Sequence, residues 1–299
     1  MKFFSQSVFS FCSAIALVIS PPALADSDLR ITLDQDTEAF ENRNMSESAI
    51  RVSVSYQPPN ESDELENLHY EIYYDDTVQL EASQSTFYRG GVSLRDLDQN
   101  GMPEVIVETY TGGAHCCTSF TVYTWRDSQF EDIQLDMLDG GGGTFRDLDE
   151  DGLQEFSTYD NAFLYAFSSY AGSYPPSVIL TFQDGEFRDM THTYEQIVRS
   201  RAWSMFQTLE SAESEGYEVN GILAGYVAQK ILLDEYESGW ELMLARYDRA
   251  SDWGLEILND QGNVIGRHPD FPTALRAFLT ELDYLTEQGD ANPTVSRME

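Results

Sequence analysis

The stretch that decides the fold is Leu94 to Val107, LRDLDQNGMPEVIV, because a second copy, FRDLDEDGLQEF, runs from Phe145 to Phe156. In both copies oxygen-bearing side chains occupy positions 1, 3 and 5, a glycine occupies position 6, and a glutamate occupies position 9. The first copy then runs into the apolar segment VIV. The repeat predicts two equivalent acidic loops, each at the entry of a β-strand.

This spacing is typical of a loop that wraps around a hard cation such as Ca²⁺. Side-chain oxygens at positions 1, 3 and 5 and a main-chain carbonyl at position 7 would be ligands, and the glycine permits the sharp turn. An EF-hand would place its glutamate at position 12, so these loops are not EF-hands. We expect two Ca²⁺ sites with these ligands: Asp96, Asp98, Asn100, Met102 and Glu104 in the first loop, and Asp147, Asp149, Asp151, Leu153 and Glu155 in the second.

Met102 and Leu153 would contribute only their carbonyl oxygens. Mg²⁺ fits less well, because it demands octahedral geometry and keeps its waters, and soft metals prefer sulfur or imidazole ligands. The alternative is a pair of Asp-rich turns whose carboxylates only cap the backbone. Electrostatics favours the cation, since several carboxylates folded into one short loop repel one another unless a positive charge lies among them.

The two quoted stretches resemble the calcium loops of FG-GAP or VCBS-type repeats. That resemblance implies a β-propeller-like domain and Ca²⁺ at both loops. The Phe-Gly and Gly-Ala-Pro signatures of the repeat are absent, and two copies are fewer than the roughly four to eight blades of a propeller. The fold class expected is therefore a mainly β N-terminal domain, partial or degenerate in its propeller character, followed by a small α-helical domain. Together with the second loop, the stretches YTGGAHCCTSF, NAFLYAFSSYAGSYPP and GILAGYVAQKILL also resemble a group of uncharacterised secreted bacterial proteins, and this resemblance implies no activity.

The N-terminus predicts export. MKFFSQSVFSFCSAIALVISPPALADS places Lys2 before an apolar run and ends in Ala23-Leu24-Ala25, the pattern of a cleaved signal peptide. A retained anchor is disfavoured because the apolar run is short and interrupted by serines and prolines. We expect a signal peptide over 1–25, a secreted or periplasmic mature chain, and no membrane span.

The net charge of the chain limits the classes of partner that it can bind. The 299 residues contain 52 Asp and Glu against 17 Lys and Arg, for a formal net charge of −35. Such a field repels nucleic acid and anionic membranes and attracts cations; simple solubility is the alternative cause. Hydrophobic residues make up 41 % of the chain, which is enough for a folded core.

Hydrophobic periodicity divides the chain. AIRVSVSY (49–56) alternates apolar and polar residues as a half-buried strand does, and similar runs predict a β-rich domain over 26–191. Beyond it the period becomes helical, with Val198, Ala202, Phe206 and Leu209 on one face and Pro272 in the first turn of a last helix. A helical domain is thus expected over 192–286 and a polar tail over 287–299.

Adjacent Cys116 and Cys117 follow His115, and they are the only cysteines after the signal peptide. In an oxidising compartment a disulfide is the default, although neighbouring Cα atoms lie about 3.8 Å apart, closer than in ordinary disulfides. Two free thiols, a metal site and thiol catalysis stay open, but adjacent cysteines lack the spacer that metal and redox motifs use.

The segment YDNAFLYAFSSYAGSYPP is rich in rings. Phe163, Tyr165 and Phe167 keep a strand period and are predicted to pack between sheets, whereas Tyr170 and Tyr174 are better candidates for exposure. An exposed aromatic surface could instead bind a sugar or a peptide.

The sequence favours a secreted, non-enzymatic, calcium-binding protein that binds a protein or carbohydrate partner. No Ser-His-Asp signature, phosphate loop or zinc-hydrolase motif appears, so no catalytic residue is predicted. The alternative is a calcium-stabilised envelope hydrolase whose carboxylates lie outside the loops. Redox work by Cys116 and Cys117 is a third class.

Overall fold

The structure, a computed structural model, describes residues 29–59, 66–139 and 141–296. The signal peptide expected over 1–25 lies outside these residues. Within the described part of the chain, none of the helices combines the length and the apolar character needed to cross a bilayer.

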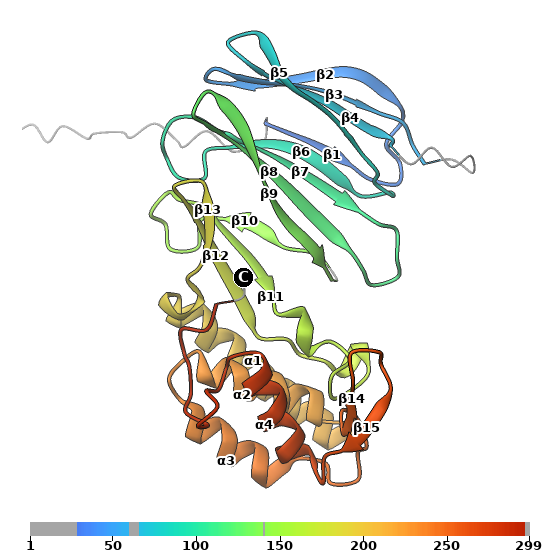
Figure 1. The fold of residues 1–299 in the computed structure, drawn as a ribbon, viewed down its shortest axis with the longest axis vertical. Helices are drawn as coiled ribbons and strands as arrows, with labels where there is room; N and C mark the ends of the chain where they lie inside the picture. Colours follow the sequence, from blue (N-terminus) through green and yellow to red (C-terminus); the bar gives the residue numbers. More distant parts are fainter. Residues whose placement is uncertain (1–28, 60–65, 140, 297–299) are drawn as a thin grey trace, which may run out of the picture.

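The β-rich part contains, within the described residues, three successive antiparallel meanders of four strands each (Figure 1). In each of them neighbouring strands follow one another in the chain. The meanders comprise β2 (Phe40–Glu47), β3 (Ile50–Tyr56), β4 (Leu68–Tyr74) and β5 (Thr77–Gln84); β6 (Gly90–Arg95), β7 (Glu104–Tyr110), β8 (Thr118–Arg126) and β9 (Gln129–Leu138); and β10 (Thr144–Arg146), β11 (Glu155–Tyr159), β12 (Ser177–Gln183) and β13 (Glu186–Asp189). A short strand, β1 (Arg30–Leu33), pairs antiparallel with β6.

The three meanders are stacked, with the second in the middle (Figure 1). Val105 and Val107 of β7 belong to the apolar cluster shared with the first meander, whereas Ile106 belongs to the cluster shared with the third. Successive side chains of a strand point to opposite faces, so a strand in the middle layer needs apolar residues on both. This explains why VIV in the first acidic copy is a continuous apolar run.

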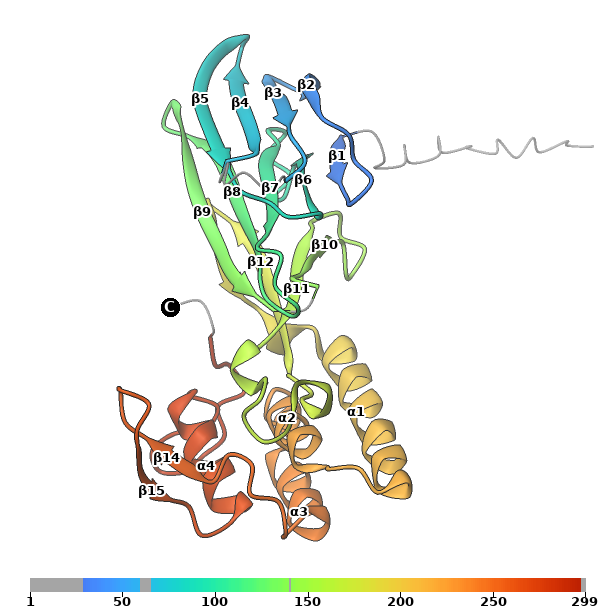
Figure 2. The ribbon, with the colours of Figure 1, turned by 90° about the vertical axis from the view of Figure 1, so that its right-hand side faces the viewer.

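A helical region follows and gathers at the end of the molecule opposite β2 to β5 (Figure 2). It contains α1 (Glu195–Glu215), α2 (Asn220–Ile231), α3 (Tyr236–Arg246) and α4 (Phe271–Glu281), with the hairpin of β14 (Glu256–Leu258) and β15 (Val264–Arg267) before α4. Asp270 caps α4 by accepting a hydrogen bond from the Thr273 N–H, and Pro272 lies in the first turn as predicted.

The helices pack closely on the segment between β11 and β12. Phe163 and Phe167 of that segment lie in the same apolar cluster as the helices. A Cβ at Gly221 would lie 2.4 Å from the Gly172 carbonyl oxygen, and one at Gly225 would overlap the Tyr174 carbonyl oxygen. Only glycine permits this approach of α2 to the segment.

The coarse fold prediction is confirmed: antiparallel sheets precede a helical region. Among the described residues the meanders do not close into a propeller, so the propeller-like character is not confirmed. The polar-tail prediction is wrong in part, because Val295 is buried in the helical cluster and Ala291 bridges to Leu285.

Gly90 and Gly91 open β6, where a Cβ at Gly91 would meet the Ile31 carbonyl oxygen at 2.4 Å. Two local expectations are also corrected. The aromatic segment is not a strand; it contains the short 3-10 helices η1 (Asn161–Phe163) and η2 (Tyr170–Gly172). On α1 the buried face includes Met205 instead of Phe206, which stacks on exposed Trp203.

Candidate metal centre

The first acidic loop joins β6 to β7 and is held by its own side chains. The Gly101 N–H donates to Asp96 Oδ2 (2.8 Å) and the Met102 N–H donates to Asn100 Oδ1 (2.7 Å). Gln99 and Gly101 have φ of 56° and 84°, the left-handed region that such a tight loop requires. The sequence folds locally in this way because short Asp and Asn side chains reach N–H groups a few residues ahead.

The second acidic loop joins β10 to β11 and repeats these contacts. The Gly152 N–H donates to Asp147 Oδ2 (3.0 Å) and the Leu153 N–H donates to Asp151 Oδ1 (2.8 Å). Glu150 and Gly152 have φ of 64° and 93°. The two copies therefore share backbone conformation as well as sequence.

The glutamate at position 9 joins the end of each loop to its beginning by accepting a hydrogen bond from the N–H at position 2. Glu104 is 1 % exposed; its Oε2 accepts from the Leu97 N–H (2.9 Å) and its Oε1 accepts from the Thr124 hydroxyl (3.1 Å). Burial, with Asp98 and Asp96 nearby, raises the pKa of Glu104 to about 7.

Glu155 is equally buried at 1 % exposed and accepts from the Leu148 N–H (2.8 Å). Its second partner is the hydroxyl of Tyr194, which immediately precedes α1. Burial again raises the pKa of the carboxyl group. In both loops the structure thus assigns this glutamate a loop-closing role that the spacing did not predict.

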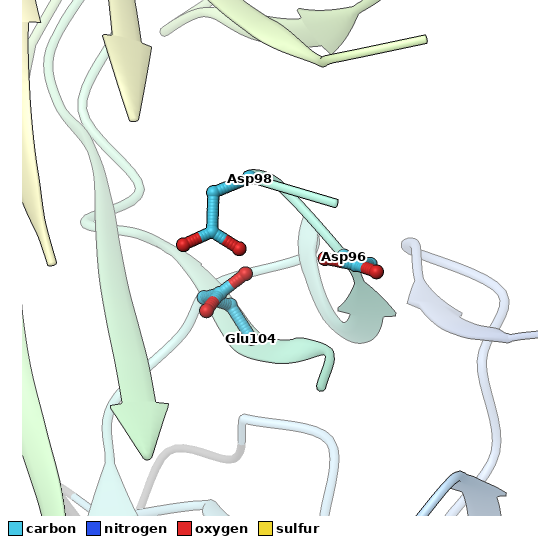
Figure 3. A group of neighbouring side chains, drawn as sticks. All are labelled: Asp96, Asp98 and Glu104. Atoms are coloured by element: carbon cyan, nitrogen blue, oxygen red, sulfur yellow. The ribbon is translucent and has the colours of Figure 1, made fainter. Parts of the chain in front are cut away.

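The carboxylates converge differently in the two loops. One oxygen each from Asp96, Asp98 and Glu104 lie within 4.8 Å of one another, and Figure 3 shows the Asp98 and Glu104 carboxylates facing each other. In the second loop the converging set is Asp147, Asp149 and Asp151, without Glu155.

Three carboxylate oxygens at this spacing are suited to a divalent cation that takes oxygen ligands. The structure brings together six of the ten predicted ligands as two such sets. Ligation by the side chains of Asn100 and Glu155 and by the carbonyls of Met102 and Leu153 stays a prediction.

The two loops also contact each other. The Gln99 amide donates to the Asp151 carbonyl oxygen (3.1 Å), and Arg95 donates to the Gln154 side chain (2.5 Å). Ser48, in the turn between β2 and β3, donates to the Gly101 carbonyl oxygen (2.8 Å). The first turns of the three meanders are therefore joined in a row, and only the stacking of the sheets makes these residues neighbours.

The cysteine stretch lies elsewhere in the fold. Cys116 and Cys117 are joined as a vicinal disulfide, with Cys117 buried and Cys116 half-buried. The exposed ring of His115 stacks on Tyr170 with the ring centroids 4.0 Å apart. Of the aromatic segment, Tyr165 is half exposed, so its predicted packing between sheets is wrong.

Residues 198–283 match the family model described as the sll0997 C-terminal domain. No solved structure matches with statistical significance.

Two curated relatives were found. The "Probable thylakoid lumen protein sll0997" of Synechocystis sp. is 39 % identical over 222 residues, which cover 71 % of this chain and 66 % of that protein. The "Uncharacterized protein y4bJ" of Sinorhizobium fredii is 31 % identical over 205 residues, or 66 % of this chain and 31 % of that protein. The chain thus spans about two thirds of the first relative and under a third of the second, and it is similar to a probable thylakoid lumen protein.

Proposed function

We propose that this protein is an exported, calcium-binding, non-enzymatic protein that binds a protein or polysaccharide partner, with one Ca²⁺ in each acidic loop. The observation that carries the calcium assignment is the duplicated geometry. Two sequences with the same spacing adopt the same backbone, and in each of them three carboxylates converge. Independent Asp-rich turns have no reason to repeat both features.

Electrostatics supports the same assignment. Keeping Glu104 ionised in its buried position next to Asp96 and Asp98 costs free energy, as its raised pKa indicates. A divalent cation reverses that cost, because it lies among the carboxylates and favours their charged form. The neighbouring second loop adds three more carboxylates to the same part of the surface.

The blade-like organisation supports the proposal that the loops are of the FG-GAP or VCBS kind. Each meander has four antiparallel strands, as a propeller blade has, and both acidic loops join the first strand of a meander to the second. The three meanders would then form an incomplete propeller-like array, because the helical region follows the third of them. Calcium would then fix the two strand entries and the contact between them.

Export is supported by the predicted signal peptide and by the name of the cyanobacterial relative, a probable thylakoid lumen protein. We place this chain in a secreted, periplasmic or comparable lumenal compartment. A hydrolase is the second candidate, but among the described residues the convergent carboxylate sets lie in the two loops, where a bound cation would occupy their oxygens.

Calcium titration of the metal-stripped protein tests the assignment. Isothermal titration should give two Ca²⁺ per chain, falling to one in Asp98→Asn and in Asp149→Asn. Asp260→Asn, an exposed charge-matched change, should keep both sites. A cation that binds only the folded state adds about 2.7 kcal/mol to stability at a hundredfold excess over Kd. A melting temperature that does not respond to calcium would contradict the proposal.

A further inference from the structure

A cavity of about 440 Å³ lies where the third meander meets the helical region. Its walls come from the Gly141–Gly143 run, the segment with η1 and η2, and α1, which contributes Arg201. This volume lies within the usual range for small-molecule sites, which occur preferentially where structural units meet.

The floor of the cavity consists of side chains on one face of β10 and β11. Thr144 pairs with Ser157 across β10 and β11, and both line the cavity, as do Arg146 and Tyr159 two residues further along each strand. Phe145 and Phe156 point to the other face and pack in the apolar cluster. The floor is thus polar and aromatic on a rigid sheet, with Tyr159 47 % exposed.

Two arginines give the cavity its charge. Among the described residues neither Arg146 nor Arg201 forms an ion pair, although acidic residues outnumber basic ones by 52 to 17. The Arg201 guanidinium lies over the Tyr159 ring at 4.6 Å and donates one long hydrogen bond, 3.3 Å, to the Pro175 carbonyl oxygen. Its Nε is buried without a partner in the described structure. Most of the five donors of this guanidinium are therefore unused.

Asp139, the acidic residue among the described lining groups, brings one negative charge against the two positive charges of the arginines, and it accepts a hydrogen bond from the Tyr170 hydroxyl (3.0 Å). Tyr170 also carries the stacked ring of His115, so the GGAHCC stretch supports the rim. The aromatic segment and the glycine run therefore meet at this cavity, and the His-Cys-Cys stretch is connected to it through the contact of His115 with Tyr170.

We propose that this cavity binds an acidic saccharide, with the carboxylate of a uronate on Arg146 and Arg201. Arginine forks match carboxylates, tyrosine rings offer flat faces for a sugar ring, and the Thr144 and Ser157 hydroxyls can pair with sugar hydroxyls. This inference names the partner class of the proposed function and in that respect rests on it.

The probe is cellobiouronic acid, a disaccharide ending in glucuronate, and cellobiose is its neutral counterpart. Isothermal titration into the full mature chain at constant saturating calcium should show binding of the acid at least about tenfold tighter than of cellobiose, equal to about 1.4 kcal/mol. Sodium sulfate and triglutamate are the competing anions. Equal binding of the two sugars, no binding of the acid, or binding of sulfate or triglutamate as tight as that of the acid would overturn the proposal.

Arg201→Gln and Arg146→Gln should each weaken binding of the acid about tenfold while leaving cellobiose unchanged. Arg249→Gln removes an exposed arginine that also lies over a tyrosine ring, and it should have no effect. If Arg201→Gln fails to fold, Gly141→Leu keeps the test sharp: Gly141 lines the cavity and a Cβ there meets no atom within 4 Å, so a large side chain can be added at the cavity wall without a clash at its Cβ. Undiminished binding in Gly141→Leu would overturn the proposal.

Calcium titration of the same samples separates the two failures. Loss of saccharide binding with intact calcium binding rejects the cavity alone. Loss of calcium binding in the unsubstituted chain rejects the calcium assignment, whatever the sugar does.

Discussion

In the loop between β6 and β7 the buried Glu104 joins Asp96 and Asp98, whereas in the loop between β10 and β11 Asp151 takes that place beside Asp147 and Asp149. The first set is more buried and the second is more exposed. At position 5 the first loop has Asn100 where the second has Asp151. Identical spacing thus leads to two converging sets of three carboxylates each, which differ in their third member and in contact with water.

The neighbours of the position-9 glutamates differ in the same way. Glu104 receives the hydroxyl of Thr124 from β8, within its own sheet, and Glu155 receives the hydroxyl of Tyr194 next to α1. The second loop is therefore linked to the helical region through Tyr194, whereas the corresponding partner of the first loop, Thr124, lies within the same sheet. The repeated motif therefore fixes the backbone conformation and the spacing of the side chains, while the surrounding elements decide which carboxylate oxygens converge.

The largest effect is expected from removing a position-9 glutamate. Glu104→Ala leaves the buried Leu97 N–H without its acceptor and opens a cavity, so unfolding in urea at saturating calcium should show a loss of about 3 kcal/mol. Glu155→Ala should cost a similar amount through the Leu148 N–H. The exposed strand residue Glu186, changed to Ala, is the control. Losses no larger than in this control would remove the loop-closing role.

The next effect depends on pH in protein freed of calcium. A glutamate whose pKa is raised on folding stabilises fully below its unfolded pKa, near 4.5, and loses that contribution as pH rises through the folded value, about 7 for Glu104. Stability should therefore fall, relative to Glu104→Gln, by roughly 2 kcal/mol across this window. Urea unfolding at several pH values measures the difference. If the free energy of unfolding changed with pH in the same way in both proteins, ionisation of Glu104 would not destabilise the folded state.

Exchanging position 5 tests the ranking of the sites. The second loop should bind calcium more tightly by ligand charge, so Asp151→Asn should weaken the tighter site about tenfold and Asn100→Asp should strengthen the weaker one. Isothermal titration should resolve two classes of site in the unsubstituted chain. A single class that neither change affects would reject the ranking.

The smallest effect is expected at the two hydroxyl partners. Tyr194→Phe and Thr124→Val should each cost about 1 kcal/mol, the first weakening calcium binding in the second loop and the second in the first loop. Thermal unfolding and calcium titration of both variants measure this. An effect of either change on both sites would mean that the loops act as one unit through the Gln99 contact with Asp151.

In the aromatic segment the strand predicted from the alternation of side chains is wrong. Phe163, Tyr165 and Phe167 alternate as strand residues do, but two short 3-10 helices interrupt the chain. The rings of Phe163 and Phe167 pack against α4, which begins about 100 residues later in the chain. Residues packed against a distant element carry no local signal of it. The cavity formed by this segment with Arg146 and Arg201 could not be predicted for the same reason.

By itself the sequence determined what depends on near neighbours in the chain. The spacing of Asp, Asn and Gly set the conformation of both acidic loops, because these side chains bond to N–H groups a few residues away. Two-residue and helical periods set the order of sheets before helices. Only the tertiary structure decided that the meanders stack, that Gln99 reaches Asp151, and that Tyr194 reaches Glu155. Those contacts follow from the burial of apolar sheet faces against each other, which depends on the whole surface of each layer and not on any short stretch of residues.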